Sequence, residues 1–349
     1  MGLGRPAGIS GRPGLTAVDM FEAVGAGEVR GIWIIATNPV ASIPDGESVK
    51  AALSRAEIVV AQDAYEDTET ARFAHVLLPA AQWSEREGTM TNAERRVCVL
   101  EKAIDPSGEA LPDWEILCRF AAKMGYGRWF DYACAEAVFE ELKQATAGRD
   151  LDMTGMTYER LRYNNGIQWP MPLGRSGGAT RLYDDGVFPT ASGRATFHTV
   201  KYRPPFEATD AEYPFVLTTG RVKDHWHTRT RTGKVAKLVN ASPGPFVEVN
   251  VEDARALRVR EGQLLRIESR RGAVELPARV SRDIRRGVVF APMHWGESGS
   301  ATTAVNLVTH GAYDPVSKEP ELKHCAVQVS RVVGAEASAM GSAPAVAGV

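Results

Sequence analysis

The chain has few cysteines, and they follow no metal-binding pattern. Cys98, Cys118, Cys134 and Cys325 are scattered over 349 residues, and no two stand at CxxC spacing. Zinc sites and iron–sulfur clusters use closely spaced cysteine or histidine ligands, so neither is predicted within this chain. Scattered cysteines are typical of reduced core thiols in a cytoplasmic protein, although a disulfide between one pair stays open as an alternative.

Long hydrophobic runs, excess charge and common catalytic motifs are absent too. No apolar run reaches about 18 residues and no apolar signal core follows Met1, so neither a membrane span nor a secretory signal is predicted. The formal net charge is −2, which gives no electrostatic case for binding nucleic acid or membranes. No GxGxxG follows a predicted strand, the P-loop frame is missing, and no nucleophile triad is recognisable. We therefore predict no catalytic residue and no metal ligand in this chain.

The pattern of apolar residues divides the chain into segments. Residues 15–147 alternate buried-strand runs, such as Gly31–Ala36 and Ile58–Ala61, with amphipathic helices. This alternation predicts a doubly wound parallel-sheet portion. Residues 148–210 show little periodicity and are interpreted as a connecting segment. Residues 211–333 hold short β-runs and one small helix, which favours a closed β-barrel. Residues 1–14 and 334–349 are predicted to be disordered from their composition.

Polar residues directly follow two of the predicted strands. Thr37 and Asn38 come after the first strand, and Gln62 and Asp63 come after the second. In an open α/β sheet, ligands bind beyond the carboxyl ends of strands. Each pair alone is also typical of a turn or a helix cap. Together they favour a nucleotide site, in which an aspartate accepts hydrogen bonds from a ribose or a guanine.

A ten-residue loop after the strand-like run Tyr213–Thr219 is the most distinctive stretch. It consists of Thr219, Gly220, Arg221, Val222, Lys223, Asp224, His225, Trp226, His227 and Thr228. The spacing of His225 and His227 would suit metal ligands, but no third ligand stands near them in sequence. A clamp for an anionic cofactor is the better interpretation, with Arg221 or Lys223 facing phosphate.

Two further stretches are dense in donors. Residues 83–96 place Arg86 between two glutamates and continue into Gly88-Thr-Met-Thr-Asn, although a solvated surface loop is the ordinary interpretation. Asn306 and the run Asp314–Lys323 precede the last predicted strand, and a loop that closes a barrel explains them equally well.

These stretches, in this order, resemble the C-terminal half of molybdopterin oxidoreductases that carry a bis-(molybdopterin guanine dinucleotide) cofactor. The resemblance covers about residues 13–331 and is strongest to assimilatory nitrate reductases. The motifs that carry it are Pro13-Gly-Leu-Thr-Ala-Val-Asp-Met-Phe, Ala36-Thr-Asn-Pro, Asp67-Thr-Glu-Thr-Ala-Arg-Phe-Ala-His-Val-Leu-Leu-Pro-Ala, Glu87-Gly-Thr-Met-Thr-Asn-Ala-Glu-Arg-Arg, Thr219-Gly-Arg, His225-Trp-His-Thr-Arg-Thr-Arg-Thr-Gly-Lys, Pro292-Met-His-Trp and Asp314–Lys323.

The resemblance implies where the cofactor binds. The implied contacts are Asn38, Gln62, Asp63, Arg86, Asp113, the loop Thr219–Thr228, Asn306 and Lys323. It also implies that the barrel is six-stranded and of the double-psi type. Arg86 stands where a lysine is frequent in the family, and Met293 stands where some relatives have an aromatic residue.

The resemblance further implies nitrate reduction by oxygen-atom transfer at molybdenum. The family's 4Fe–4S cluster and molybdenum ligand belong to an N-terminal half that this sequence does not contain, so we expect activity only with a complementing N-terminal chain. Nitrate and an electron-donor protein or reductase domain are the expected partners. The alternatives are a portion of a formate dehydrogenase α-subunit and a non-catalytic cofactor-binding fragment.

Overall fold

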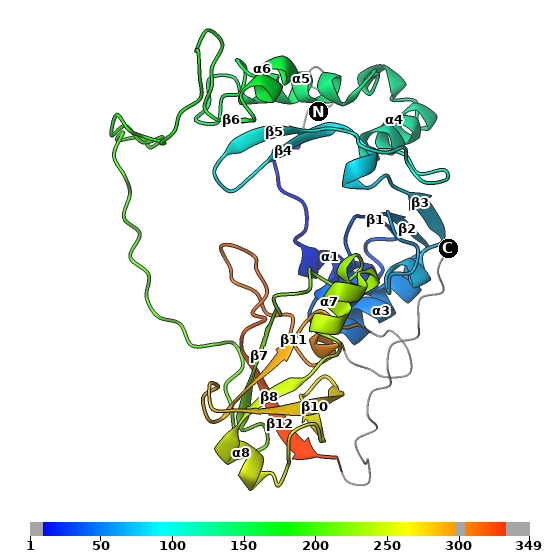
Figure 1. The fold of residues 1–349 in the computed structure, drawn as a ribbon, viewed down its shortest axis with the longest axis vertical. Coiled ribbons are helices and arrows are strands. Elements are labelled where there is room, and N and C mark those ends of the chain that lie inside the picture. Colours follow the sequence, from blue (N-terminus) through cyan, green and yellow to red (C-terminus); the bar gives the residue numbers. More distant parts are fainter. Residues whose placement is uncertain (1–9, 297–303, 333–349) are drawn as a thin grey trace. The chain divides into compact units, whose positions relative to one another are not determined.

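The computed structural model describes residues 10–296 and 304–332 of the 349-residue chain. They form two compact units that interleave along the sequence (Figure 1). The first unit contains Gln62–Ala64 and Leu78–Tyr202. The second contains Gly14–Ala61, Tyr65–Leu77 and the residues from Arg203 onward. The predicted tail, 334–349, and most of the predicted disordered start lie outside the described residues.

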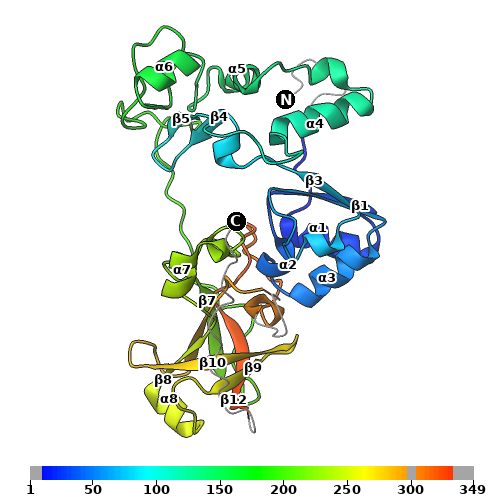
Figure 2. The ribbon, with the colours of Figure 1, turned by 45° about the vertical axis from the view of Figure 1, so that its right-hand side comes forward.

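The second unit begins with an α/β segment. Its elements are α1 (Ala17–Ala26), β1 (Gly31–Ile35), α2 (Pro39–Ser42), α3 (Gly46–Arg55), β2 (Ile58–Asp63), a 3-10 turn η1 (Ala71–Phe73) and β3 (Val76–Pro79). The strands form a parallel sheet of order β1-β2-β3, as the sequence predicts; the last residues of β2 and β3 belong to the first unit. Helices α1 and α3 lie side by side (Figures 1 and 2). Their apolar faces form one buried cluster with the strands, including Phe21, Leu53 and Val59.

The sequence Thr16-Ala-Val-Asp19 is a capping pattern that predicts the start of α1, whereas the run Glu66–Ala74, whose sequence predicts a short helix, forms only η1. Thr16 accepts a hydrogen bond from the Asp19 amide, which satisfies a free donor of the first turn. In the shortened segment, the Thr68 hydroxyl accepts from the Ala71 amide at 3.1 Å. The Thr70 amide donates to the Asn38 side chain at 3.2 Å. Such local side-chain bonds compete with helical hydrogen bonding.

The rest of the second unit is a closed six-stranded barrel, which confirms the predicted fold class. Its elements are β7 (Phe215–Gly220), η4 (Thr232–Lys234), α7 (Ala236–Ala241), β8 (Val247–Asn250), α8 (Val251–Ala256), β9 (Leu264–Glu268), β10 (Ala273–Ser281), β11 (Val288–Pro292), η5 (Val305–Leu307) and β12 (Cys325–Arg331). The strands close in the order β10-β8-β11-β7-β12-β9. Alternate residues point inward and form a core of mainly Val, Leu and Ile.

The pairing of β11 with β7 is parallel and sets the position of the chain that follows each strand. Pro292 lies opposite Gly220, and the Met293 amide donates to the Gly220 carbonyl at 2.9 Å. Parallel neighbours end at the same side of a sheet. The two segments that leave these strands, Arg221 onward and Met293 onward, therefore start side by side.

The barrel is joined to the α/β segment within the second unit. The Asn306 side-chain amide donates to the Ala41 carbonyl at 2.9 Å, and Leu307 packs on Gly46 at the start of α3. The Tyr313 hydroxyl donates to Asp19 at 2.7 Å. These contacts hold helices α1 to α3 against the barrel loops.

The first unit combines a small antiparallel sheet with helices. Its elements are η2 (Trp83–Glu85), β4 (Gly88–Thr91), β5 (Arg96–Leu100), α4 (Asp113–Lys123), η3 (Gly127–Trp129), α5 (Ala135–Thr146), α6 (Tyr158–Tyr163) and β6 (Ile167–Gln168). The sheet order is β4-β5-β6. Within the expected connecting segment, a buried cluster contains Tyr158 and Leu161 of α6, Ile167 of β6, and Met156, which precedes α6. The sequence hides this core because the apolar residues are spaced irregularly between glycines and arginines.

Candidate functional site

The predicted loop Thr219–Thr228 is anchored where it leaves β7. The Thr219 amide and hydroxyl both donate to the Leu322 carbonyl, at 3.3 and 2.7 Å. The Lys323 ammonium donates to the Thr219 carbonyl at 2.5 Å. A Cβ on Gly220 would lie 2.5 Å from the Phe290 ring, so only glycine fits there without a shift. The loop therefore starts from a fixed point.

The middle of the loop is held by backbone and side-chain contacts. The Val222 amide donates to the Nε2 atom of His294 at 2.8 Å. Asp224 accepts from the Lys223 ammonium at 2.9 Å and from the Ser242 hydroxyl at 2.8 Å, and these two bonds lower its pKa. Arg221 is exposed and lies over the Trp226 ring at 5.6 Å. Arg221 and Trp226 are thus presented at the surface of the loop.

The two histidines of the loop occupy different environments. His225 is 5% exposed; its Nε2 donates to the Ser242 carbonyl at 2.8 Å, and its Nδ1 lies 3.2 Å from the Thr232 hydroxyl. His227 has a left-handed backbone, with φ of 44°. Burial and the neighbouring Arg221 and Arg231 lower the pKa of His227. No set of three His, Cys, Asp or Glu side chains in the described ranges is placed to hold a metal.

A polar cavity of about 210 Å³ lies beside the end of this loop. It is lined by Asp67, Thr68, Glu69, Thr228, Arg229, Thr230, Gly233, Lys234, His294 and Gly296. Lys234 pairs with Asp67 at 2.5 Å, whereas Arg229 makes no salt bridge with any residue that the structure describes. The Nε of Arg229 is buried without a hydrogen-bond partner in those residues.

Arg229 gives this cavity an anion-binding character. Burial lowers the pKa of its guanidinium, and the nearby Glu69 carboxylate raises it. The guanidinium lies over the Trp295 ring at 5.1 Å, which orients the side chain. A buried cation with an unused donor, next to threonine hydroxyls, suits an anionic group such as a phosphate.

Asn38 sits behind the cavity and connects it to the α/β segment. Its amide nitrogen donates to Glu69 at 2.7 Å and to the Thr228 hydroxyl at 3.2 Å. Its oxygen accepts from the Thr70 hydroxyl at 2.7 Å. Asn38 is 7% exposed, so in this structure its hydrogen-bonding groups bind protein. It positions Thr228 and Glu69 at the cavity wall.

In this structure, the side chains of Asn306 and Lys323 donate to backbone carbonyls within the second unit. Asn306 is 2% exposed and donates to the carbonyls of Ala41 and Ser42, whereas its Oδ1 is buried without a partner among the described residues. Lys323 is exposed but donates to the Thr219 carbonyl. Their predicted contacts with a cofactor stay predictions.

The first unit brings together three of the other predicted residues. Gln62 is fully buried at the end of β2 and donates to Asp113 at 2.8 Å. Arg86 donates to the other carboxylate oxygen of Asp113 at 2.5 Å. The Oε1 of Gln62 is buried without a partner in the described residues. Asp63 is half-buried, and its carbonyl accepts from the Ala80 amide at 3.0 Å. Gln62 and Arg86 thus fix the position of the Asp113 carboxylate, with one donor on each oxygen.

Three residues at the cavity were not singled out from the sequence. Glu69, Arg229 and His294 lie within the motifs quoted above, but their spacing gives no sign that they converge. Glu69 and His294 are 9% and 1% exposed. Glu69 comes from the α/β segment, His294 follows β11 and Arg229 follows the loop, so spacing alone could not have identified them.

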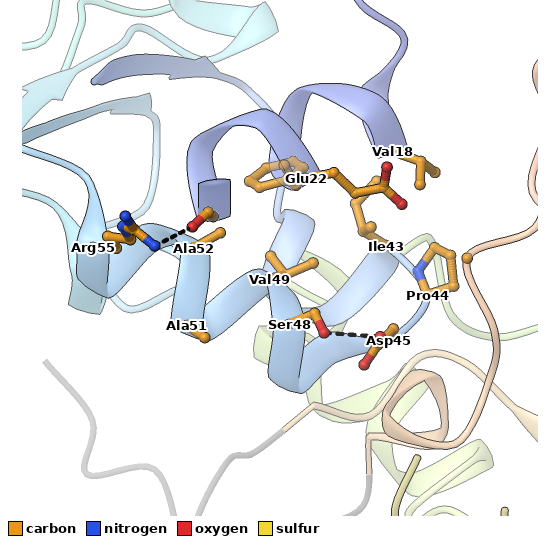
Figure 3. A pocket seen from close by; sticks show the side chains of 13 residues that line it. Val18, Glu22, Ile43, Pro44, Asp45, Ser48, Val49, Ala51, Ala52 and Arg55 are labelled. Atoms are coloured by element: carbon orange, nitrogen blue, oxygen red, sulfur yellow. Dashed lines mark hydrogen bonds between the residues drawn. The ribbon is translucent and has the colours of Figure 1, made fainter. Parts of the chain in front are cut away.

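A second cavity, of about 480 Å³, lies between α1 and α3 in the second unit (Figure 3). Its walls are largely apolar and include Val18 and Val49. Three of its polar side chains bond within the chain: Arg55 donates to the Gly25 carbonyl and Ser48 donates to Asp45, both at 2.8 Å (Figure 3). None of the predicted binding residues lines it, so the smaller polar cavity is the better candidate site.

Two family models match the chain. The model described as molybdopterin oxidoreductase matches residues 7–123, and that described as molydopterin dinucleotide binding domain matches residues 215–326. The second match covers the barrel from the start of β7 and includes the loop Thr219–Thr228. None of the helices in the described ranges is long and apolar enough to cross a membrane.

Similar proteins include enzymes with different substrates in their names. The chain is 44% identical to a nitrate reductase of Synechocystis sp. over 94% of its length and 46% of that protein. It is 41% identical to the F420-dependent formate dehydrogenase subunit alpha of Methanocaldococcus jannaschii, over 91% of the chain and 46% of that protein. It is 38% identical to the assimilatory nitrate reductase catalytic subunit of Bacillus subtilis, over 91% and 44%.

Among solved structures, the acetylene hydratase from Pelobacter acetylenicus matches with a TM-score of 0.71. That match covers 90% of this chain and 46% of the other, at 18% identity, and it therefore supports the fold alone. The chain spans about half the length of the curated relatives that it matches.

Proposed function

Because the chain belongs to the molybdopterin oxidoreductases, we propose that it binds a molybdopterin guanine dinucleotide and forms part of a nitrate reductase. The observation that carries the proposal is Arg229, a half-buried cation without a salt bridge in the described residues, at a cavity beside the loop Thr219–Thr228. Each dinucleotide contains a pyrophosphate, which is the kind of anion that such a donor set binds.

The residues present fit this cofactor. In the second unit, Arg229, Thr228 and Thr230 offer a guanidinium and two hydroxyls at the cavity, and Arg221 and Trp226 are exposed on the adjacent loop. In the first unit, the unpaired Oε1 of Gln62 lies beside the Asp113 carboxylate, which is suited to the N–H donors of a guanine. We propose that these residues hold the cofactor, together with the other predicted contacts.

When bound, the molybdenum of such a cofactor would supply two-electron oxygen-atom transfer. This chain's own residues would bind and orient the dinucleotide portions, and we assign none of them a catalytic role. We propose that the 4Fe–4S cluster, the molybdenum ligand and the contact with an electron donor belong to a complementing N-terminal part. Turnover therefore requires that part.

Nitrate is the substrate that we favour, with formate as the alternative. The run His225-Trp-His-Thr-Arg-Thr-Arg-Thr-Gly-Lys, in which Arg229 lies, resembles assimilatory nitrate reductases. The identities to the Synechocystis nitrate reductase and the M. jannaschii formate dehydrogenase subunit, 44% and 41%, are close. We propose a cytoplasmic location, because the four cysteines are free in the structure and scattered in sequence.

The first experiment measures molybdenum, iron and pterin in the purified chain by elemental mass spectrometry and by pterin fluorescence after oxidation. Molybdenum and pterin without iron would support cofactor binding by this chain alone. If neither is found, the chain is co-expressed with the unmatched N-terminal part of the Synechocystis relative, and the measurement is repeated. Absence of both in the co-expressed complex would contradict the proposal.

The substrate is tested on the same complex. Nitrate-dependent oxidation of reduced methyl viologen is expected, without formate-dependent reduction of the dye. The reverse result would establish the formate dehydrogenase alternative. A complex that contains molybdenum and pterin but turns over neither substrate would favour the non-catalytic cofactor-binding fragment.

A further inference from the structure

His294 connects the two arms of the loop Thr219–Thr228 from outside it. It follows β11 by two residues and is 1% exposed. Its Nε2 lies 2.8 Å from the Val222 amide nitrogen, and its Nδ1 lies 2.6 Å from the His227 carbonyl oxygen. One ring therefore bridges a residue at the start of the loop and a residue near its end.

The two backbone partners determine the protonation state of the ring. An amide N–H can only donate, so Nε2 must be without a proton in order to accept from Val222. A carbonyl can only accept, so Nδ1 must hold the proton that it donates to His227. The bridge thus requires the neutral Nδ1–H tautomer. A second proton on the ring would place two N–H groups against each other at Val222.

The surroundings of the ring favour the neutral form. Burial lowers the pKa of His294, the hydrogen bond to the His227 carbonyl raises it, and His225, Arg221 and Arg229 lower it further. His225 lies 5.9 Å from the ring of His294. Across the polar cavity stand the acids Asp67 and Glu69 and the cation Lys234, which are the remaining charged groups of its wall.

The bridge holds a backbone that would not persist by itself. His227 has a φ of 44°, a left-handed conformation that costs a non-glycine residue free energy. Its carbonyl is fixed by His294, and Thr228, the next residue, is fixed by Asn38 at 3.2 Å. The His227 side chain therefore faces the loop surface, and the Thr228 side chain faces the cavity.

We propose that His294 is a positioning residue that fixes the loop Thr219–Thr228 in its ligand-binding conformation, and only in the neutral state. This inference rests on the proposed function, because it assigns the loop to the dinucleotide. It adds that nucleotide affinity depends on pH through a residue whose ring nitrogens both bond to the backbone of the loop. Protonation of His294 at acidic pH releases the Val222 amide, because the protonated ring has no acceptor for it.

The test combines two variants with two measurements on the full chain. His294→Ala removes both bonds, whereas His294→Gln offers an amide oxygen and an amide nitrogen that can replace the ring nitrogens but cannot titrate. His310→Gln is the matched control, because His310 is 3% exposed and its Nε2 bonds to the His324 carbonyl and Glu321 rather than to a residue of the loop. Amide hydrogen exchange at Val222 reports the bridge, and GDP titration reports binding.

Exchange at Val222, corrected for the intrinsic rate, should rise by on the order of tenfold in His294→Ala and stay near the wild-type value in His294→Gln and His310→Gln. Lowering the pH from 7 to 5 should raise it in the wild type but not in His294→Gln. GDP affinity should fall in His294→Ala and stay near the wild-type value in His294→Gln and His310→Gln. Wild-type protection in His294→Ala, or equal loss in His294→Ala and His294→Gln, would overturn the proposal.

Nitrogen-15 spectra of labelled histidine provide an independent readout. They should show the Nδ1–H tautomer for His294 at pH 7, and an Nε2–H tautomer or an imidazolium there would also overturn the inference. If the wild type fails to bind GDP while the exchange results hold, the proposed nucleotide site fails and the positioning role stands. The two failures are therefore distinguishable.

Discussion

The replacement of Arg229 by methionine tests the candidate site most directly. Methionine keeps a long apolar side chain, so the packing on Trp295 is partly retained, and the backbone bond from the Gly233 amide to the residue 229 carbonyl, 2.7 Å, is unaffected. What is lost is a guanidinium with a buried, unpartnered Nε beside a cavity of about 210 Å³. The substitution therefore removes charge and hydrogen-bond donors with little change in shape.

The expected effects on binding and on stability differ in size. A hydrogen bond to a charged group contributes about 1.5–3 kcal/mol, which corresponds to about a 10- to 150-fold loss of affinity for an anion. In the ligand-free chain, the lost cation–π contact of about 0.5–2 kcal/mol is opposed by relief from burying a charge without an ion pair. We therefore expect the free energy of unfolding to change by less than about 1 kcal/mol.

The assay is calorimetric titration with GDP at fixed ionic strength, together with urea unfolding of the ligand-free chain. Arg231→Met is the matched control, since Arg231 is exposed and two residues away, and its loss should weaken binding by less than about threefold. Arg229→Lys should recover part of the affinity. Equal losses in Arg229→Met and Arg231→Met would refute a specific role for Arg229, as would unchanged GDP affinity in Arg229→Met.

Two further predictions concern residues that stabilise the fold of the second unit. Burial opposes ionisation of Glu207, but hydrogen bonds, chiefly from Arg271, lower its pKa from 4.5 to about 2. Glu207→Gln should therefore reduce the free energy of unfolding at pH 7 by about 2 kcal/mol after allowance for solvent screening. Because the folded pKa is depressed, this contribution is complete above about pH 4.5 and is lost as the pH falls toward 2. Urea unfolding curves of wild type and variant should converge over that range, and a constant difference would contradict the assignment. A Cβ on Gly296 would lie 1.9 Å from a carboxylate oxygen of Glu69, which Asn38 holds through the other oxygen at 2.7 Å. Gly296→Ala should lower stability by about 1–3 kcal/mol in thermal unfolding, and an unchanged melting temperature would show that Glu69 moves freely.

The parts of the fold that were predictable from sequence are those with local signals. Continuous apolar runs predicted the parallel strands, and short β-runs with one small helix predicted the barrel. The core formed by Met156, Tyr158 and Leu161 was not predictable, because its residues follow neither helical nor strand periodicity. Propensity also failed at Glu66–Ala74, where threonine side chains bind the backbone and limit the helix to three residues.

The candidate site also has a part that was predictable from the sequence and a part that was not. The loop Thr219–Thr228 was evident from sequence because its polar residues are contiguous. The cavity was not, because Glu69, Arg229 and His294 are brought together only by the parallel pairing of β11 with β7 and by the Asn38 bridge. This arrangement has a physical consequence for binding. The ring of His294 bonds to the loop backbone through both nitrogens, and Arg229 is a cation at the cavity without a salt bridge in the described residues. Because Arg229 is half-buried, the anion affinity that we propose for it should depend on salt less than that of a surface cluster of lysines, which solvent ions screen.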